Sequence, residues 1–183
     1  MDISELIEKQ KSLSEELGNG KVDQSEDDNI DEDIVQFVSF MLEDVEYGIE
    51  ILTVHEILRI PDMTRLPNVP SFIIGVINLR GNIIPVVDVR ERFSIPQKEY
   101  TEQTRIIVIE TDDKLVGLLV DYVHQVVRIP QSHIDEPSDL IEGVSEEFIS
   151  GIARMRDRLI VILNITNLIF EEDEVALENS FTE

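Results

Sequence analysis

From Ile34 onward, short apolar runs alternate with polar turn residues. Runs of this kind, rich in Val and Ile and bounded by Gly, Pro, Asp or Asn, are typical of strands. We therefore expect an all-β fold, a barrel or a sandwich, with few short helices. The pattern predicts strands or hairpins at 34–42, 45–52, 75–89, 105–110, 115–120, 123–129 and 151–165. It predicts short helices at 88–93, 145–149 and 166–170, and leaves 54–57 either helical or extended.

The apolar hairpin at 75–89 has the clearest turn chemistry. Gly81-Asn82 separates its two apolar runs, and Gly reaches a positive φ without steric cost. Arg80 stands at the mouth of that turn. Pro85 lies inside the second run, and because proline cannot donate to a strand ladder, we expect a sheet edge or a bulge there. Such a hairpin suits a surface that meets another protein.

The same pattern occurs twice along the chain. Residues that match at one offset of 69 (117 − 48) are Gly48 with Gly117, His55 with His124, and Arg59 with Arg128. Residues that match at an offset of 76 (151 − 75) are Gly75 with Gly151, Arg80 with Arg156, and Asp88 with Asn164. Constant offsets indicate two similar units, at about 34–96 and 105–165, joined near 97–104. Units of about 65 residues are marginal alone, so we expect them to pack together with a groove where they meet.

The two ends of the chain have a different composition. Residues 1–17 carry Ile3, Leu6, Ile7, Leu13 and Leu17 at roughly helical spacing, and 23–33 are acidic and polar. This leader at 1–33 is expected to be a frayed helix on a disordered tether, or alternatively a helix that docks on a partner. A second acidic tail covers 171–183.

The net charge of −24 is concentrated in those ends. Residues 1–33 carry 12 acidic and 3 basic side chains, and 171–183 carry 6 acidic and no basic ones. This balance argues against binding nucleic acid or an anionic membrane surface. The sequence has no Cys, no apolar run long enough to span a bilayer and no signal-peptide pattern, so we expect a cytoplasmic protein without disulfides or zinc-thiolate sites.

Catalytic chemistry is not indicated. No nucleophile motif or phosphate-binding loop is found, and His55, His124 and His133 have no metal-ligand spacing. His55 and His124 hold equivalent positions, which favours a shared role in the fold. Arg80 is either a charge that deters edge pairing or a fixed cation that pairs with a partner's oxygen atoms.

Two segments carry a resemblance to a known family. Residues 46–57 read E-Y-G-I-E-I-L-T-V-H-E-I, which resembles the first signature of the CheW family, the bacterial chemotaxis coupling proteins. Residues 72–81 read F-I-I-G-V-I-N-L-R-G, followed at 84–88 by I-P-V-V-D, which resembles its most specific signature. Segments 105–121 and 151–165 continue the match, which covers 35–170 and leaves out the leader and the tail.

The resemblance implies two five-stranded barrels packed around a shared hydrophobic core in a domain at 34–170, closed by a helix at 166–170. It implies a non-catalytic adaptor, without cofactor or metal, that couples transmembrane chemoreceptors to the histidine kinase CheA in receptor arrays. The helical tip of the receptor would lie in the groove between the barrels, and the barrel ends would contact the regulatory domain of CheA. The residues implied for the receptor are Val54, Gly75, Arg80, Val123 and Val126. Those implied for the kinase are Glu56 and Ile57.

Two alternatives remain open. The same adaptor could serve a chemosensory pathway other than motility. An enzyme with its site in the inter-barrel groove, using His55 or His124 as the base, is the alternative from a different class. The related CheV and CheA proteins carry receiver or kinase domains, for which 1–33 and 171–183 are too short, so a stand-alone coupling protein is expected. The hairpins of the two copies differ: the first has Gly81-Asn82 and Pro85 where the second has Asp157-Arg158 and Val161. This difference favours Arg80 over Arg156 for receptor contact.

Overall fold

The computed structural model describes residues 3–17, 33–137 and 144–170. Within these ranges the fold is built of strands with few short helices, which confirms the all-β class. The strands are β1 (Ile34–Leu42), β2 (Val45–Glu50), β3 (Val54–Leu58), β4 (Ile73–Leu79), β5 (Asn82–Asp88), β6 (Arg105–Thr111), β7 (Lys114–Val120), β8 (Tyr122–Pro130), β9 (Ile134–Asp135), β10 (Ile149–Arg154) and β11 (Leu159–Leu163). The helices are α1 (Ile3–Leu17), α2 (Val89–Arg92) and α3 (Ile165–Phe170), with single 3₁₀ turns at Ile51–Thr53, Gln131–His133 and Glu146–Phe148.

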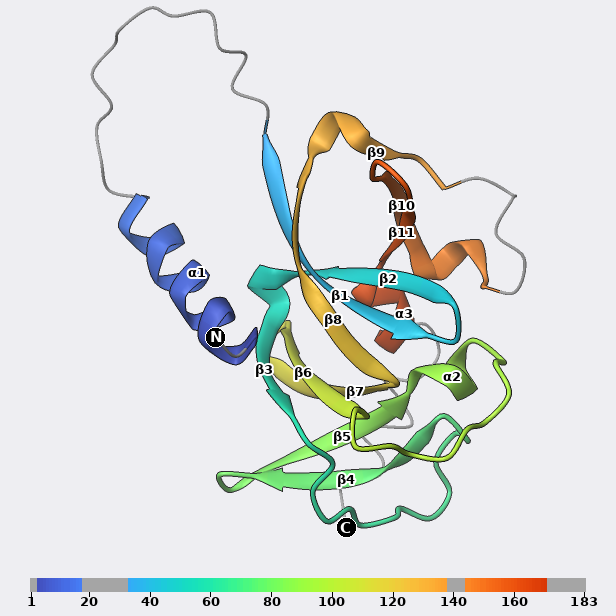
Figure 1. Ribbon diagram of the computed structural model, residues 1–183. Helices are drawn as coiled ribbons and strands as arrows, with labels where there is room; N and C mark the ends of the chain where they lie inside the picture. Colours follow the sequence, from blue (N-terminus) through green and yellow to red (C-terminus); the bar gives the residue numbers. More distant parts are fainter. Residues whose placement is uncertain (1–2, 18–32, 138–143, 171–183) are drawn as a thin grey trace, which may run out of the picture.

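The strands form two curved sheets (Figure 1). One has the order β8-β1-β2-β11-β10-β9 and the other β3-β6-β7-β5-β4. The end strands of each order do not pair, so the sheets are open where the sequence predicted closed barrels. The predicted organisation in two similar all-β subdomains is confirmed.

The two sheets are copies of one another at the offsets found in the sequence. At 69 residues β1, β2 and β3 correspond to β6, β7 and β8, and at 76 residues β4 and β5 correspond to β10 and β11. In both sheets the equivalent strands follow the same order, and each sheet combines the first two strands of one copy with the last three of the other. Thus β1 and β2 join β8, β10 and β11, and β6 and β7 join β3, β4 and β5, so that β3 pairs with β6 and β8 with β1. Each sheet therefore takes strands from both of the predicted ranges, 34–96 and 105–165.

The division of each copy between the two sheets, which begins at its third strand, has a physical cause. The two edges of β2 are taken by β1 and, in parallel, by β11. A place for β3 beside β1 would be parallel to β1, and a parallel neighbour needs a crossover of about a dozen residues or more. Only the turn Ile51–Thr53 separates β2 from β3, so the chain passes directly into the other sheet.

Gly48 and Gly117 explain why one glycine recurs in both copies. Each glycine lies on a strand that has a parallel neighbour. Gly48 of β2 is opposite Ile162 of β11, and Gly117 of β7 is opposite Val86 of β5. A Cβ atom at Gly48 would lie 3.1 Å from a methyl group of Ile162, and one at Gly117 only 2.8 Å from Ile106. The copies therefore need glycine here for close strand packing.

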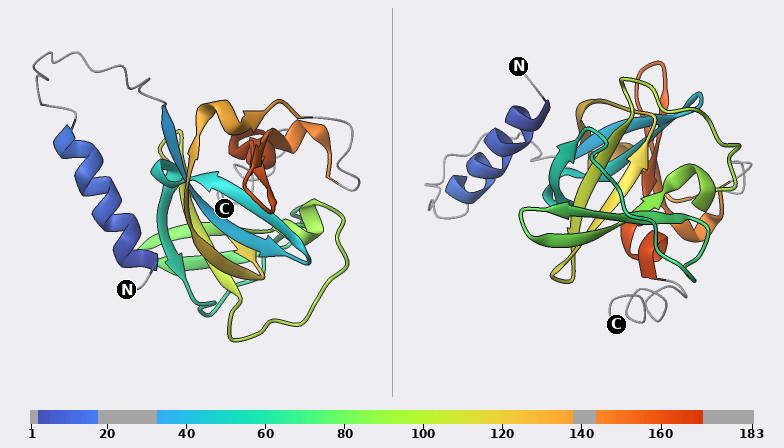
Figure 2. Two further views of the ribbon diagram at one scale, coloured as in Figure 1. Left: turned by 45° about the horizontal axis from the view of Figure 1, so that its top comes forward. Right: turned by 90° about the horizontal axis from the view of Figure 1, so that it is seen from below.

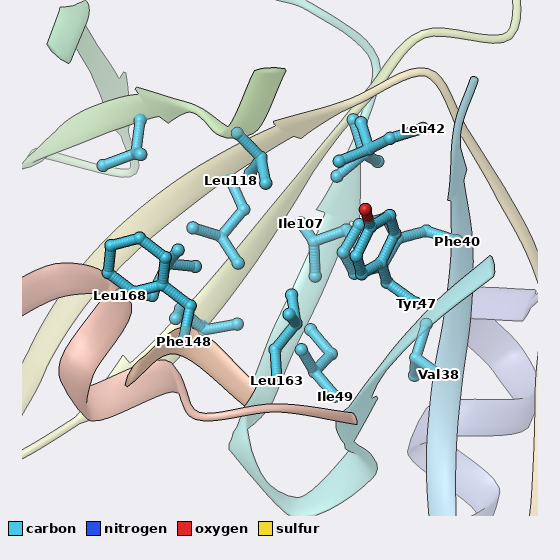
Figure 3. Packing of buried hydrophobic residues seen from close by; sticks show 14 of the residues in the cluster. Val38, Phe40, Leu42, Tyr47, Ile49, Ile107, Leu118, Phe148, Leu163 and Leu168 are labelled. Carbon is cyan, nitrogen blue, oxygen red and sulfur yellow. The ribbon is translucent and has the colours of Figure 1, made fainter. Parts of the chain in front are cut away.

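The predicted shared core lies between the two sheets. Figure 3 shows Phe40 and Tyr47 from one sheet facing the side that carries Ile107 and Leu118 from the other. The rings of Phe40 and Tyr47 are stacked with centroids 5.7 Å apart. Leu168 of α3 closes the same cluster. Each sheet also encloses a smaller apolar cluster of its own. Burial of this core joins the two subdomains into one structure.

The β4–β5 hairpin differs from its predicted geometry by one residue. Leu79 pairs with Asn82, so the two turn residues are Arg80 and Gly81, with φ of 51° and 88°. Two positive φ values are typical of a type I′ turn, which matches the twist of the strands. The Gly81 N–H donates to Oδ1 of Asn78 at 3.0 Å. Arg80 thus lies in the turn itself.

The prediction for Pro85 is also corrected. β5 lies between β4 and β7 and is not an edge strand, and the bulge is in β4, between Ile73 and Gly75. Pro85 faces Val76, whose N–H and C=O both bond to Thr64 and not to β5. The ladder with β7 begins only at Val86, so no strand partner requires an N–H from Pro85.

Arg90 of α2 is a buried cation that ties four segments together. Its side chain is 5% exposed. The guanidinium donates to Asp121 (Nε–Oδ1 2.7 Å) and to the carbonyl of Pro96 (2.6 Å), and it pairs with Glu43 (2.6 Å). Burial acts to raise the pKa of Asp121, but the hydrogen bonds from Arg90 and the Glu43 amide outweigh it, so this pKa is lowered. The connection between β7 and β8 is thereby fixed to the β1–β2 turn.

The short helices α2 and α3 begin with equivalent caps. Oδ1 of Asp88 accepts hydrogen bonds from the N–H groups of Arg90 (3.0 Å) and Glu91 (3.4 Å). Asn164 accepts one from Asn167 at 3.2 Å. Burial raises the pKa of Asp88 although these hydrogen bonds oppose the shift. Burial therefore disfavours the charged form of the Asp88 carboxyl group.

We expect Asp88→Asn to keep or increase stability at pH 7, by less than about 1 kcal/mol, because Asn caps helices about as well as Asp. A raised folded-state pKa means that protonation of Asp88 stabilises the wild type as the pH falls, and the variant lacks this gain. Urea unfolding at pH 7 and pH 4.5 should show the difference between the two proteins shrinking in acid. A clear loss of stability at pH 7 would contradict this reading of the cap.

Candidate functional site

β3 and β8, the third strands of the two copies, form the floor of a groove between the subdomains. α1 packs against both strands, outside the two sheets (Figure 2). A cleft of ≈ 360 Å³ remains beneath the start of α1. Its lining residues are Ile3, Ser4, Ile57, Arg59, Gln103, Arg105, Tyr122 and Val123. The expected groove between the units is thus present, with part of the leader lying on it.

Four of the seven residues implied for partner contact gather at this floor. Val54 is fully buried within the shared core. Ile57, Val123 and Val126 are partly buried and pack against the same cluster. Ile57 and Val123 also line the cleft, one from β3 and one from β8. The floor is therefore an apolar surface that continues directly into the core.

The Arg80 side chain reaches β3 from the tip of the hairpin. Its Nη1 and Nη2 atoms lie 2.9 Å and 3.2 Å from the two carboxylate oxygens of Glu56. The Arg80 side chain is 71% exposed and that of Glu56 21%. The structure thus brings together one residue implied for the receptor and one implied for the kinase. A bidentate pair of this kind has a fixed orientation.

The second copy lacks this ion pair, a difference that the sequence comparison did not single out. The residues equivalent to Glu56 and Arg80 are Gln125 (125 − 56 = 69) and Arg156 (156 − 80 = 76). An amide replaces the carboxylate, so Arg156 has no charged counterpart at the matching position. The sequence repeat does contain this difference, because Glu56 has no acidic residue at its matching position in the second copy.

Gly75 lies apart from the groove floor, on β4 at the far edge of the five-stranded sheet. It is buried beside the bulge, and a Cβ atom there would lie 2.6 Å from the carbonyl oxygen of Thr64. The close approach of backbone to backbone accounts for glycine at this position. Its implied contact with a receptor stays a prediction.

The histidines of the enzyme alternative do not line the cleft. Nδ1 of His55 lies 3.7 Å from a carboxylate oxygen of Glu110 at an exposed position, and the His124 ring meets that of Tyr122 edge-on. Among the described residues, no group of three His, Cys, Asp or Glu side chains could hold a metal ion. The cleft instead joins apolar side chains of β3 and β8, such as Ile57 and Val123, to the polar margin formed by Arg59, Gln103 and Arg105.

Comparison with known proteins decides the family. The CheW-like domain family matches residues 36–173. The chain belongs to the CheW family. Among curated relatives, the chemotaxis protein CheW of Helicobacter pylori is 30% identical over 167 residues, covering 91% of this chain and 95% of the relative. That of Bacillus subtilis is 34% identical over 137 residues, covering 75% and 88%.

A solved CheW structure agrees with the fold. The scaffolding protein TtCheW from Thermoanaerobacter tengcongensis superposes with a TM-score of 0.71 at 36% identity, covering 75% of this chain and 94% of the other. The H. pylori alignment extends further than the domain. Residues 34–183 number 150, which is 82% of the chain (150/183), whereas the alignment covers 91%, so it includes part of 1–33. Part of the leader is therefore aligned with the H. pylori relative.

The described helices of this CheW-family chain include none that is long and apolar enough to cross a bilayer.

Proposed function

We propose that this CheW-family protein is a non-catalytic adaptor that couples the cytoplasmic tip of chemoreceptors to the regulatory domain of CheA in chemotaxis arrays at the cytoplasmic face of the membrane. The observation that carries the proposal is the apolar groove between two equivalent subdomains of a CheW-family chain. An amphipathic helix laid in such a groove is a common mode of recognition. The names of the relatives and of the solved scaffold support a role in chemotaxis.

In this proposal the receptor helix packs on the floor of β3 and β8. Val123 and Val126 are accessible in part and supply apolar contact area, while Val54 supports them from the core. Arg80 is bound to Glu56 of β3 and keeps most of its side chain in solvent, so it is available to the partner without breaking the core. An aliphatic floor together with an oriented arginine fits the composition of interface hot spots.

The proposed kinase contact uses the outward side of the same strand. Glu56 and Ile57 are neighbours on β3, so their side chains point to opposite faces. Ile57 lines the cleft and Glu56 is bound to Arg80. Receptor and kinase surfaces therefore adjoin along β3 in this proposal, and Arg80 is the residue that both would share.

Reversing the charge of Arg80 tests the receptor role. We expect Arg80→Glu to weaken binding of a soluble receptor tip by about tenfold or more, because it removes an oriented cation and sets two carboxylates against each other. The double variant Glu56→Arg/Arg80→Glu should restore the ion pair and the stability of the wild type, but not receptor binding. Calorimetric titration and thermal unfolding measure the two effects separately.

Arg156→Glu is the matched control, since it makes the same change at the equivalent place in the second copy. It should leave receptor binding within about twofold of wild type. Full recovery of binding in the double variant would show that Arg80 acts only by holding Glu56. Unchanged binding in Arg80→Glu would refute its proposed role altogether.

A further inference from the structure

α1 already occupies the groove that the proposed function assigns to a receptor helix. It packs on β3 and β8, and its Ile7 is 2% exposed within the same apolar cluster as Val54. Ile3, one turn before Ile7, packs against this cluster together with Val123 and Val126. α1 therefore covers the floor residues through which the receptor would bind.

We propose that α1 is an intramolecular competitor for this groove, so that a receptor helix binds only when α1 leaves. The inference rests on the proposed function, because it concerns the same site. Two helices cannot occupy one apolar floor, so a receptor helix can bind only to molecules in which α1 is undocked. The apparent Kd for the receptor is therefore the intrinsic Kd divided by the undocked fraction.

The helix is suited to reversible docking. Its described anchors are few, chiefly Ile3 and Ile7 at a spacing of four residues. A helix of 15 residues is marginal in water without tertiary packing, so α1 gains much of its helical order from the groove. The cleft that remains between Ile3 and the floor shows that α1 fills the groove incompletely. A helix with larger apolar side chains would bury more of the same surface.

Docking of α1 is intramolecular. Residues 18–32 join the end of α1 to Asp33, so the competitor stays on the same chain as its groove. The fraction of grooves that α1 covers is therefore independent of the protein concentration.

Ile7→Glu in the full chain tests the competition. This change places a charge at the buried anchor, and Lys9→Gln is the matched control, because it alters the net charge equally at an exposed position of α1. We expect Ile7→Glu to bind a soluble receptor tip about tenfold more tightly than wild type, and Lys9→Gln to bind as wild type does. A fluorescent peptide of residues 1–17 should bind Ile7→Glu and be displaced by the receptor tip.

Equal receptor affinity of wild type and Ile7→Glu would overturn the proposal. A peptide that binds Ile7→Glu but is not displaced by a bound receptor tip would overturn it too, because the two helices would then have separate sites. Absence of receptor binding in every variant would instead refute the proposed function, and peptide binding would then still report docking of α1. A single cooperative thermal unfolding transition in each variant verifies that the domain at 34–170 remains folded.

Discussion

Replacing Arg90 by methionine is expected to lower the free energy of unfolding by about 3–5 kcal/mol, the usual cost of removing one partner from a buried ion pair. Methionine keeps most of the length of the side chain but makes none of the hydrogen bonds to Asp121, Glu43 and the Pro96 carbonyl. The Asp121 carboxylate would be left without its main counter-charge. The loss should be large because these bonds hold the β7–β8 connection, α2 and the β1–β2 turn in one place.

Chemical denaturation of Arg90→Met and of the exposed Arg59→Met as a charge-matched control measures the effect. The lowered pKa of Asp121 also fixes the sign of the pH dependence. Its contribution to stability is complete above the pKa of the unfolded state and is lost as the pH falls through the lower folded-state pKa. The gap between Arg90→Met and wild type should therefore narrow in acid. A loss of unfolding free energy below about 1 kcal/mol at pH 7 would mean that the attraction within the ion pair only offsets the cost of desolvating its charges.

The second large effect is expected for Gly75→Ala, at about 1–3 kcal/mol of lost stability. The added methyl group would lie 2.6 Å from the Thr64 carbonyl oxygen, and a backbone atom cannot move aside as a flexible side chain does. The hydrogen bonds between Thr64 and Val76 should break, releasing the segment before β4 from the sheet edge. Hydrogen exchange at the amides of Thr64 and Val76 reports this directly.

Gly81→Asn is the matched control for Gly75. A Cβ atom at Gly81 has no neighbour within 4 Å, and Asn tolerates its positive φ. Binding of a receptor tip measured on the same variants separates the two roles of Gly75. If Gly75→Ala loses receptor affinity with its stability and exchange rates intact, the glycine acts in a contact and the backbone argument is wrong.

The sequence predicted local structure well and strand pairing poorly. The runs at 34–42 and 105–110, the turn acids and the short helix after Asp88 all follow from periodicity and turn chemistry, which are local. The pairing of β3 with β6 and of β8 with β1 is not local. Both copies carry the same alternation, so β3 fits against β1 or β6 equally well by pattern. The decision comes from the length of the connection at Ile51–Thr53 and from the occupied edges of β2, which appear only in three dimensions.

The candidate site shows the same limit. The resemblance supplied Ile57 and Val123, and the structure brings them to one cleft. The role of the leader was only half foreseen: the spacing of Ile3 and Ile7 predicted a helix, but its position on the chain's own groove depends on a surface assembled from both sheets. Arg90 escaped notice because its partners, Glu43 and Asp121, are distant in sequence and lie in ordinary turn positions.

The division of both copies between the two sheets gives this domain the form of a domain-swapped homodimer joined into one chain. If each copy stood alone as a separate polypeptide, its last three strands would complete the sheet begun by the first two strands of the other copy, and neither protomer would be whole alone. The connector at 97–104 would then be the peptide that makes such an obligate dimer permanent. The carboxylate of Glu56 against the amide of Gln125 is one place where the two copies differ.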